Sequence, residues 1–371
     1  MSHVLLVSNT ARNIYHYRRT VWTALLRAGY RVSAAAAADD RVEDLKRKGI
    51  AFYAVPLLAH YGRNPAKLFI IYRQFSRLYR RVAPDLVLHF TIQPNTLGTL
   101  AAARRRLPTA ATITGLGTTW LQSGISRYIT VKLYRWCLRF ADLVITQNEQ
   151  DRKDLLAGGV RPAAWRTIEG SGVDTELYTG RTSWVLPRER TFLYLGRMLK
   201  DKGIQELFVA WNLAWQRGLR GRLLLVGDRP GDHPRVLPEA TWRRGLQLPG
   251  VSHHPAVADV RPYLADSHFV VLPSYREGLS LTLLEALATE TPILTTRVPG
   301  CRELVEGRHT GWAVTPRSAE ALADAFLAAH HTEVKEWRRM GENGRRLVIH
   351  NHSAEVVAAA YREVVESLVT N

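Results

Sequence analysis

Two glutamates, Glu277 and Glu285, have seven residues between them in a stretch that follows the apolar run Phe269 to Leu272. A short apolar run that ends in Pro and Ser is typical of a buried strand, and the apolar residues beyond it recur at helical spacing. We therefore expect a strand, a turn and a helix, with Glu277 just before the helix and Glu285 on it. Two carboxylates around a helix start can hold a nucleotide sugar, because both can accept hydrogen bonds from sugar and ribose hydroxyls.

The turn between these acids has the composition of a phosphate site. Gly278 lets the backbone approach a ligand closely, and free N–H groups near Leu279 and Ser280 at the helix start favour negative charge. The alternative is a capped helix whose acids are only solvated. This segment alone favours neither interpretation.

A second candidate site is the segment Gly196–Gly203, which follows the first expected strand of the second half of the chain and opens a helix. Arg197 and Lys202 are placed there as two cations that can bind a diphosphate, and Gly203 allows a close chain passage. An exposed basic loop is the structural alternative. No Asp-x-Asp motif occurs at a strand end to hold a metal ion.

Together these motifs resemble the retaining GT-B glycosyltransferases of family 4, the glycosyl transferases group 1, which carry an E-x7-E signature. Further segments that are similar to the family occur in order across the second half, together with a turn before it: Gly170–Asp174, Leu224–Asp228, Val257–Val260 and Val298–Val305. The resemblance implies that Arg197 and Lys202 hold the donor diphosphate, that Glu285 binds the ribose and that Glu277 contacts the transferring sugar. It further implies transfer with retained configuration, no metal and no cofactor, with a UDP-sugar as substrate. Residues on the donor side would be Gly196, Gly227, Val257, Gly278, Leu279, Ser280 and Glu285.

Three loops of the first half resemble a branch of the family that adds N-acetylgalactosamine or a related sugar to undecaprenyl-diphosphate-linked saccharides. They are Ser8–Arg18, His89–Gly98 and Ala111–Trp120. The candidates on the acceptor side are Asn9, Arg12, Arg18, His89 and Thr114.

One position departs from the family pattern. Many members carry a His at the end of the fifth strand, and here Thr114 stands at that place. His89 and His16 are candidate substitutes, although a lone His near a strand end is more often a structural residue.

Short apolar runs alternate with helical patterns along the whole chain, which predicts parallel, doubly wound sheets. The fold class is therefore α/β, with two Rossmann-like domains that face each other across a cleft at the carboxyl ends of the strands. The expected strands of the first half are 4–7, 31–37, 51–55, 86–90, 109–114, 143–146 and 166–169, and its helices are 14–28, 65–82, 94–106, 127–140 and 150–157. The second half should have strands 192–195, 223–226, 251–255, 269–272, 292–295 and 311–314.

Turn-rich residues at 170–187 suggest a domain boundary. We predict an N-terminal acceptor-binding domain at 1–180, a nucleotide-sugar-binding domain at 181–348 and a C-terminal segment at 349–371. The apolar stripe of the last helix, near 354–369, requires a surface to cover, so we expect it to pack back on the first domain.

The net charge of +18 is concentrated in the first half: residues 1–180 carry 26 Lys and Arg against 12 Asp and Glu, and residues 181–371 carry 25 against 21. Such asymmetry indicates an anionic partner, either nucleic acid or acidic lipid. No nucleic-acid-binding motif is present, which favours a membrane surface. Two cysteines, no signal-peptide pattern and no long apolar run indicate a cytoplasmic protein, peripheral on the inner face of the cell membrane.

The helix at 65–82 supports this partner, because its arginines share one face and its apolar residues Ile71, Phe75, Leu78 and Val82 share another. Solvation of the outer face of an ordinary amphipathic helix is the alternative. Three other functions are weighed against a transferase that acts on a lipid-linked acceptor. These are a hexosyltransferase acting on lipopolysaccharide or a soluble acceptor, a UDP-sugar 2-epimerase-like isomerase, and a non-catalytic relative. The sequence does not identify the sugar, the acceptor, the linkage or the oligomeric state.

Overall fold

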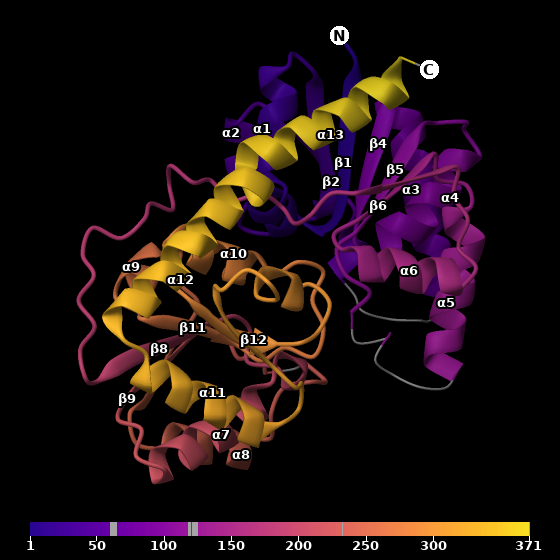
Figure 1. Ribbon diagram of the computed structural model, residues 1–371. Coiled ribbons are helices and arrows are strands. Elements are labelled where there is room, and N and C mark those ends of the chain that lie inside the picture. The colour runs from indigo at the N-terminus through magenta and orange to yellow at the C-terminus, as the bar shows by residue number, and fades with distance from the viewer. Residues whose placement is uncertain (60–64, 118–119, 121–124, 232, 371) are drawn as a thin grey trace. The chain divides into compact units, whose positions relative to one another are not determined.

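The computed structural model describes residues 1–59, 65–117, 120, 125–231 and 233–370, and these form two compact units (Figure 1). The first unit consists of residues 1–172 and 354–371, and the second of residues 173–353. The segment 173–190 belongs to the second unit because Tyr178 and Arg181 hydrogen-bond there to Glu285 and Glu290. These contacts place the start of the second unit at residue 173.

The first unit contains a parallel sheet with seven strands among its described residues, in the order β3-β2-β1-β4-β5-β6-β7. The strands are β1 (His3–Thr10), β2 (Arg31–Ala37), β3 (Ala51–Ala54), β4 (Leu86–Phe90), β5 (Thr109–Ile113), β6 (Leu143–Thr146) and β7 (Ala164–Thr167). The helices are α1 (Arg19–Arg27), α2 (Val42–Arg47), α3 (Pro65–Val82), α4 (Thr99–Ala103), α5 (Ile125–Leu138), α6 (Glu149–Ala157) and α13 (Ala354–Val369), with one-turn segments η1 (Asn13–Tyr17), η2 (Pro56–Ala59) and η3 (Pro94–Gly98).

The second unit contains a parallel sheet with six strands among its described residues, in the order β10-β9-β8-β11-β12-β13. The strands are β8 (Arg190–Leu195), β9 (Gly221–Val226), β10 (Val251–His254), β11 (Phe269–Leu272), β12 (Ile293–Thr296) and β13 (Gly311–Val314). The helices are α7 (Ile204–Gln216), α8 (Glu239–Leu246), α9 (Arg261–Ala265), α10 (Leu281–Ala288), α11 (Ala319–His331) and α12 (Val334–Leu347), with short segments η5 (Lys200–Lys202), η6 (Arg302–Leu304) and η7 (Val348–His352).

Both sheets are doubly wound, so the expected α/β class with two Rossmann-like domains is confirmed. In each sheet the strand order reverses at one point, between β1 and β4 in the first and between β8 and β11 in the second. Ligands of such sheets bind at the carboxyl ends of the strands at the point of reversal. The two places where the sequence predicts ligand contacts are thus the loops after β1 and β4 and the loops after β8 and β11.

The C-terminal helix α13 packs on α1 of the first unit, as expected, and Figure 1 shows the two helices side by side. Its residues Val357, Tyr361, Val364 and Val365 are buried, whereas Val356 is exposed. The core of this unit therefore receives side chains from both ends of the chain.

Two expected helices differ from the prediction. The one at 14–28 is divided into η1 and α1 at Arg18, whose side chain turns into the core and lies over the ring of Phe90. The one at 94–106 runs without a break from η3 into α4 and ends at Ala103. Helix α2 was not expected, because its six residues are too few for a clear periodic pattern.

Candidate active site

Lys202 and Glu277 meet at the carboxyl ends of β8 and β11. The Lys202 Nζ atom lies 2.5 Å from Glu277 Oε1, and both side chains are only partly exposed. Lys202 ends the short turn η5 after β8, and Glu277 lies in the loop after β11. Two separate motifs of the sequence are therefore brought together by the reversal of strand order.

Gly203 makes this meeting possible. Its backbone is left-handed, with φ 74°, and a Cβ atom at this position would lie 2.1 Å from the carbonyl oxygen of Pro273. Only glycine permits the chain that carries Lys202 to pass so close to the end of β11.

Two other predicted glycines form a second close backbone contact. A Cβ atom on Gly227, after β9, would lie 2.0 Å from the carbonyl oxygen of Gly196, after β8. The neighbouring Arg197 is exposed, and its carbonyl oxygen accepts a hydrogen bond from Tyr194. The backbone beneath Arg197 is thus fixed, while its guanidinium is accessible to a ligand.

The start of α10 differs from the expectation in one respect. The N–H of Ser280 is not free, because it donates to the carbonyl oxygen of Gly300, which lies in the loop after β12. The Ser280 hydroxyl accepts from the N–H of Leu283 and caps the helix, as a serine at this position commonly does. Gly278, Leu279 and Ser280 are buried. The N–H predicted to be free at Ser280 is therefore occupied, and α10 begins at Leu281.

Glu285 is held by a residue that the sequence analysis did not single out. The hydroxyl of Tyr178 donates to Glu285 Oε1 at 2.9 Å. Burial raises the pKa of Glu285 to about 7, and the hydrogen bond from Tyr178 opposes this rise. No motif identifies this contact, because Tyr178 lies 107 positions away in the sequence.

Val257 lies after β10 and is half-buried against the core of the second unit. The N–H of the preceding Ala256 donates to Asp228, in the loop after β9. This hydrogen bond connects the loops after the neighbouring strands β9 and β10, next to two further segments that resemble the family.

The candidates on the acceptor side lie in the first unit, and their surroundings differ. Asn9 accepts a hydrogen bond from Ser8 at the end of β1. Arg12 is exposed and forms an ion pair with Asp40 at 2.9 Å. Thr114 directly follows β5 and is half-buried. These three side chains are at or near strand ends, as predicted.

Arg18 and His89 instead lie in the core. The Arg18 guanidinium lies 4.6 Å from the centre of the Phe90 ring and donates to Ser171. His89 is fully buried, with Nε2 2.7 Å from the Tyr79 hydroxyl and Nδ1 3.2 Å from that of Thr99. Burial lowers the pKa of His89 to about 3, so the ring is neutral. These contacts fit the structural alternative stated for His89.

His16 lies in η1, where it is exposed. Partial desolvation of its imidazole and the neighbouring cations Arg41 and Arg12 lower its pKa. Of the third predicted loop, Thr118 and Thr119 lie outside the described residues.

The predicted apolar face of helix α3 is part of the core. Ile71, Phe75, Leu78 and Val82 are all buried against the first sheet. The exposed apolar residues are others, Phe69 and Ile70 on α3 and Tyr128, Ile129, Trp136 and Phe140 on or next to α5. The apolar face of α3 that we expected to support membrane binding therefore stabilises the fold. Any membrane contact must instead use the exposed apolar residues of α3 and α5.

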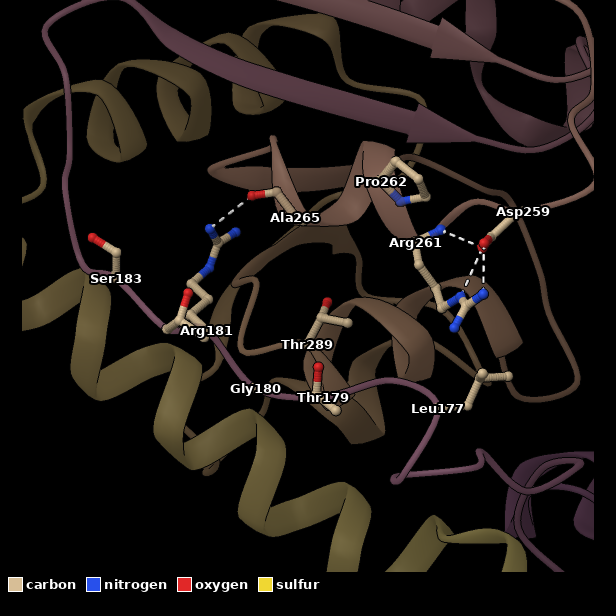
Figure 2. Close-up of a pocket in the computed structure, with 11 residues that line it drawn as sticks. Leu177, Thr179, Gly180, Arg181, Ser183, Asp259, Arg261, Pro262, Ala265 and Thr289 are labelled. Atoms are coloured by element: carbon tan, nitrogen blue, oxygen red, sulfur yellow. Dashed lines mark hydrogen bonds and ion pairs between the residues drawn. The ribbon is translucent and has the colours of Figure 1, made fainter.

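A surface pocket of about 500 Å³ lies elsewhere in the second unit (Figure 2). Arg181 at one end donates to the carbonyl oxygen of Ala265, and Arg261 at the other pairs with Asp259. Neither Lys202, Glu277 nor Glu285 lines it. Its cations are already engaged by protein atoms, so the strand ends remain the better candidate site. Among the described residues, no three His, Cys, Asp or Glu side chains cluster closely enough to hold a metal ion.

Comparison with known proteins identifies the class. The family described as glycosyl transferases group 1 matches residues 189–332, and the glycosyl transferase 4-like domain matches residues 15–169. An N,N'-diacetylbacillosaminyl-diphospho-undecaprenol alpha-1,3-N-acetylgalactosaminyltransferase of Campylobacter jejuni is 20% identical over 98% of each chain. The protein TuaC of Bacillus subtilis, named for teichuronic acid biosynthesis, is 33% identical over 80% of this chain and 75% of its own.

Solved structures agree on the fold. A sucrose-phosphate synthase of Thermosynechococcus elongatus superposes with a TM-score of 0.83 at 21% identity, over the whole of both chains. The Anabaena protein HepE, solved with UDP and glucose, superposes with a TM-score of 0.80 at 17% identity, over 99% of this chain and 100% of its own. The two doubly wound units are those of a GT-B glycosyltransferase. The chain belongs to the glycosyl transferases group 1 family.

Proposed function

We propose that this glycosyltransferase moves a sugar from a UDP-sugar to a polyprenyl-diphosphate-linked saccharide with retention of configuration. The sugar we propose is N-acetylgalactosamine or another N-acetylhexosamine, and the pathway is the synthesis of a surface polysaccharide or glycan. The observation that carries the proposal is the meeting of Lys202 and Glu277 at the point where strand order reverses.

The donor diphosphate would take the place of Glu277 as the partner of Lys202. Arg197, which is exposed in the same segment after β8, supplies a second cation. As the bond to the sugar breaks, negative charge grows on the departing UDP, and two fixed cations together with the start of α10 stabilise that charge. Glu277, once released from Lys202, can accept hydrogen bonds from the sugar hydroxyls. The chemistry then needs neither a metal ion nor a cofactor.

The acceptor class is supported by the name of the C. jejuni relative, which acts on an undecaprenol-diphosphate saccharide. In this chain the acceptor would be bound by the first unit, where Asn9, Arg12 and Thr114 lie at or near strand ends. A hexosyltransferase acting on lipopolysaccharide or a soluble acceptor is the second candidate, since a glycosyltransferase is named for teichuronic acid synthesis among the relatives. Membership of the transferase family favours both over an epimerase-like isomerase.

The test is transfer from a panel of UDP-hexoses and UDP-N-acetylhexosamines to a polyprenyl-diphosphate-linked amino sugar, with the lipid product identified by mass. A gain of one N-acetylhexosamine with the α configuration by NMR is expected. A gain of one hexose would exclude the proposed sugar, and a product of inverted configuration would exclude retention. Binding of UDP without any lipid product would exclude the acceptor.

We also propose that the first unit binds the anionic inner surface of the cell membrane. Residues 45–141 contain 16 Lys and Arg and one Asp or Glu. Helices α3 and α5 both pack against α4 and η3, so they share one side of the first unit. Exposed rings accompany their cations, with Arg73 5.9 Å from the Phe69 ring centre and Lys132 5.2 Å from that of Tyr128. Each cation near an acidic leaflet contributes about 1 kcal/mol. Among the described residues, no helix is long and apolar enough to span a bilayer.

Cosedimentation with vesicles tests this surface. Phe69→Ser combined with Trp136→Ser should lower binding to vesicles that contain phosphatidylglycerol, and added salt should lower it further. Val209→Ser in the second unit is the matched control, because Val209 is 47% exposed and Trp136 48%. Equal binding of neutral and anionic vesicles, or equal loss in the control, would contradict the proposal.

A further inference from the structure

Tyr178 is the side chain that contacts Glu285, and it comes from the segment by which the chain enters the second unit. Its hydroxyl donates to Glu285 Oε1 at 2.9 Å. Among the described residues, Tyr178 is the donor to the Glu285 carboxylate and it contacts Oε1, so Oε2 is the oxygen that remains for a ligand. The phenol therefore decides which carboxylate oxygen faces the donor.

The backbone of Tyr178 is itself held in place. Its N–H donates to the carbonyl oxygen of Asp174, and the Asp174 carboxylate accepts a hydrogen bond from the N–H of Leu177. Its carbonyl oxygen accepts from Arg345 of α12, and the same Arg345 nitrogen donates to Ala288 at the end of α10. Tyr178 and α10 are thus fixed to each other by a shared cation, which gives the phenol a defined direction.

Resting on the proposed function, we propose that Tyr178 is a positioning residue: its hydroxyl donates to Oε1 of Glu285 and orients the carboxylate, so that Oε2 accepts a hydrogen bond from the donor ribose. A neutral carboxylic acid is a poorer acceptor than a carboxylate. A ribose-binding glutamate that is buried needs a donor of this kind, since burial disfavours its charge.

The electrostatics agree with this role. Burial raises the pKa of Glu285 to about 7, and the Tyr178 hydrogen bond is the contact that lowers it. Burial and the adjacent Glu285 raise the pKa of Tyr178, so the phenol stays protonated and remains a donor at neutral pH. The Tyr178 hydroxyl is therefore a donor over the whole pH range in which Glu285 titrates.

The other charged groups near this pair are few. Strands β11 and β12 next to α10 carry no titratable side chain. The elements packed on α10 and Tyr178 contribute Arg345 of α12, His350 and His352 of η7, Asp259 before α9 and Arg261 at the start of α9. Asp259 and Arg261 act on Tyr178 with opposite sign.

The experiment is the affinity for UDP, measured by titration calorimetry from pH 5.5 to 8.5, for wild type and Tyr178→Phe. The variant keeps the ring and loses the hydroxyl. We expect its Kd to be about tenfold higher than that of wild type at pH 7, the loss typical of a hydrogen bond to a charged group. The ratio of the two constants should fall as the pH rises, because Glu285 then ionises without help. A purely structural role would give a ratio that does not depend on pH.

Two further variants make the result decisive. Tyr263→Phe, a half-buried tyrosine of the same unit, is the matched control and should follow wild type at every pH. In a Glu285→Gln background, Tyr178→Phe should have no pH-dependent effect, because no carboxylate is left to ionise. A pH-independent ratio, or a pH effect that persists in the Gln background, overturns the inference about Tyr178. Unchanged UDP affinity in Glu285→Gln alone would instead remove Glu285 from the donor site and with it that part of the proposed function.

Discussion

Lys202 Nζ lies 2.5 Å from Glu277 Oε1 although the two residues are 75 positions apart in the sequence. Their side chains are 22% and 15% exposed, so water still reaches both. For an ion pair that is mostly buried, the cost of removing both charges from water offsets much of their attraction, so the pair is weak evidence for a contribution to folding stability. The fold holds the pair at the end of the sheet through glycine contacts and turns, and the small stability gain suggests a role in binding.

Replacement of Lys202 by alanine should therefore abolish most of the transfer activity and leave the fold intact. Loss of one group that stabilises the transition-state charge commonly lowers kcat by about 100-fold or more. Initial rates with the UDP-sugar found in the panel, together with a thermal melt, measure both effects. Lys200→Ala, an exposed lysine of the same short turn, is the control and should retain activity. Glu277→Ala should behave like Lys202→Ala, and wild-type turnover in either would exclude this site.

The sequence was sufficient for the parts of this site that depend on local chemistry. The periodicity predicts both sheets, and the motifs predict Lys202, Glu277 and the glycines that allow their chains to meet. These residues lie in strand-to-helix turns, where residue type and conformation are closely coupled. Their proximity follows from the order of the strands, which a doubly wound pattern implies.

What the sequence could not predict depends on contacts between distant segments. The N–H of Ser280 is occupied by Gly300, and no local pattern shows that the loop after β12 returns to this point. Helical periodicity located the apolar face of α3 correctly, but periodicity is the same whether such a face meets a sheet or a membrane. The donor to Glu285 was missed for the same reason, since a tyrosine in a turn-rich segment carries no signal of its partner.

Gly203→Ala should disrupt the site by moving the turn that carries Lys202. The new Cβ would lie 2.1 Å from the carbonyl oxygen of Pro273, on a backbone with φ 74°. The turn must move, which displaces Lys202, so we expect a destabilisation of about 1–3 kcal/mol and a large loss of activity. Gly218→Ala separates the two causes, because Gly218 also has positive φ but has no atom within 4 Å of its Cβ position. Its activity should be retained at a smaller cost in stability, measured by urea unfolding. Equal losses in both variants would mean that backbone strain alone matters.

Removal of divalent metal ions should leave the transfer rate unchanged, because the proposed stabilisation of the departing diphosphate comes from Arg197, Lys202 and the start of α10. The measurement is the initial rate in excess EDTA, compared with the rate in added magnesium or manganese. A rate that falls more than about tenfold in EDTA and recovers with metal would contradict the proposed role of these cations.

Glu285→Gln should make the folded protein more stable at neutral pH while it weakens donor binding. Burial raises the pKa of Glu285 from 4.5 to about 7 in the folded state. A carboxyl group with a raised pKa takes up its proton more readily when folded, so its stabilising contribution is complete below pH 4.5 and is lost as the pH rises through 7. The shift corresponds to about 3 kcal/mol. The variant, which cannot ionise, should match wild type near pH 4 and exceed its free energy of unfolding by up to about 3 kcal/mol at pH 8. Urea unfolding at pH intervals between these two values measures the difference.

The control is Glu176→Gln, because Glu176 is an exposed glutamate two residues before Tyr178. Its free energy of unfolding should differ from that of wild type by an amount that stays constant with pH. If the difference in free energy of unfolding for Glu285→Gln is also constant with pH, the Glu285 carboxylate is well solvated. Burial of this carboxylate would then not influence donor binding.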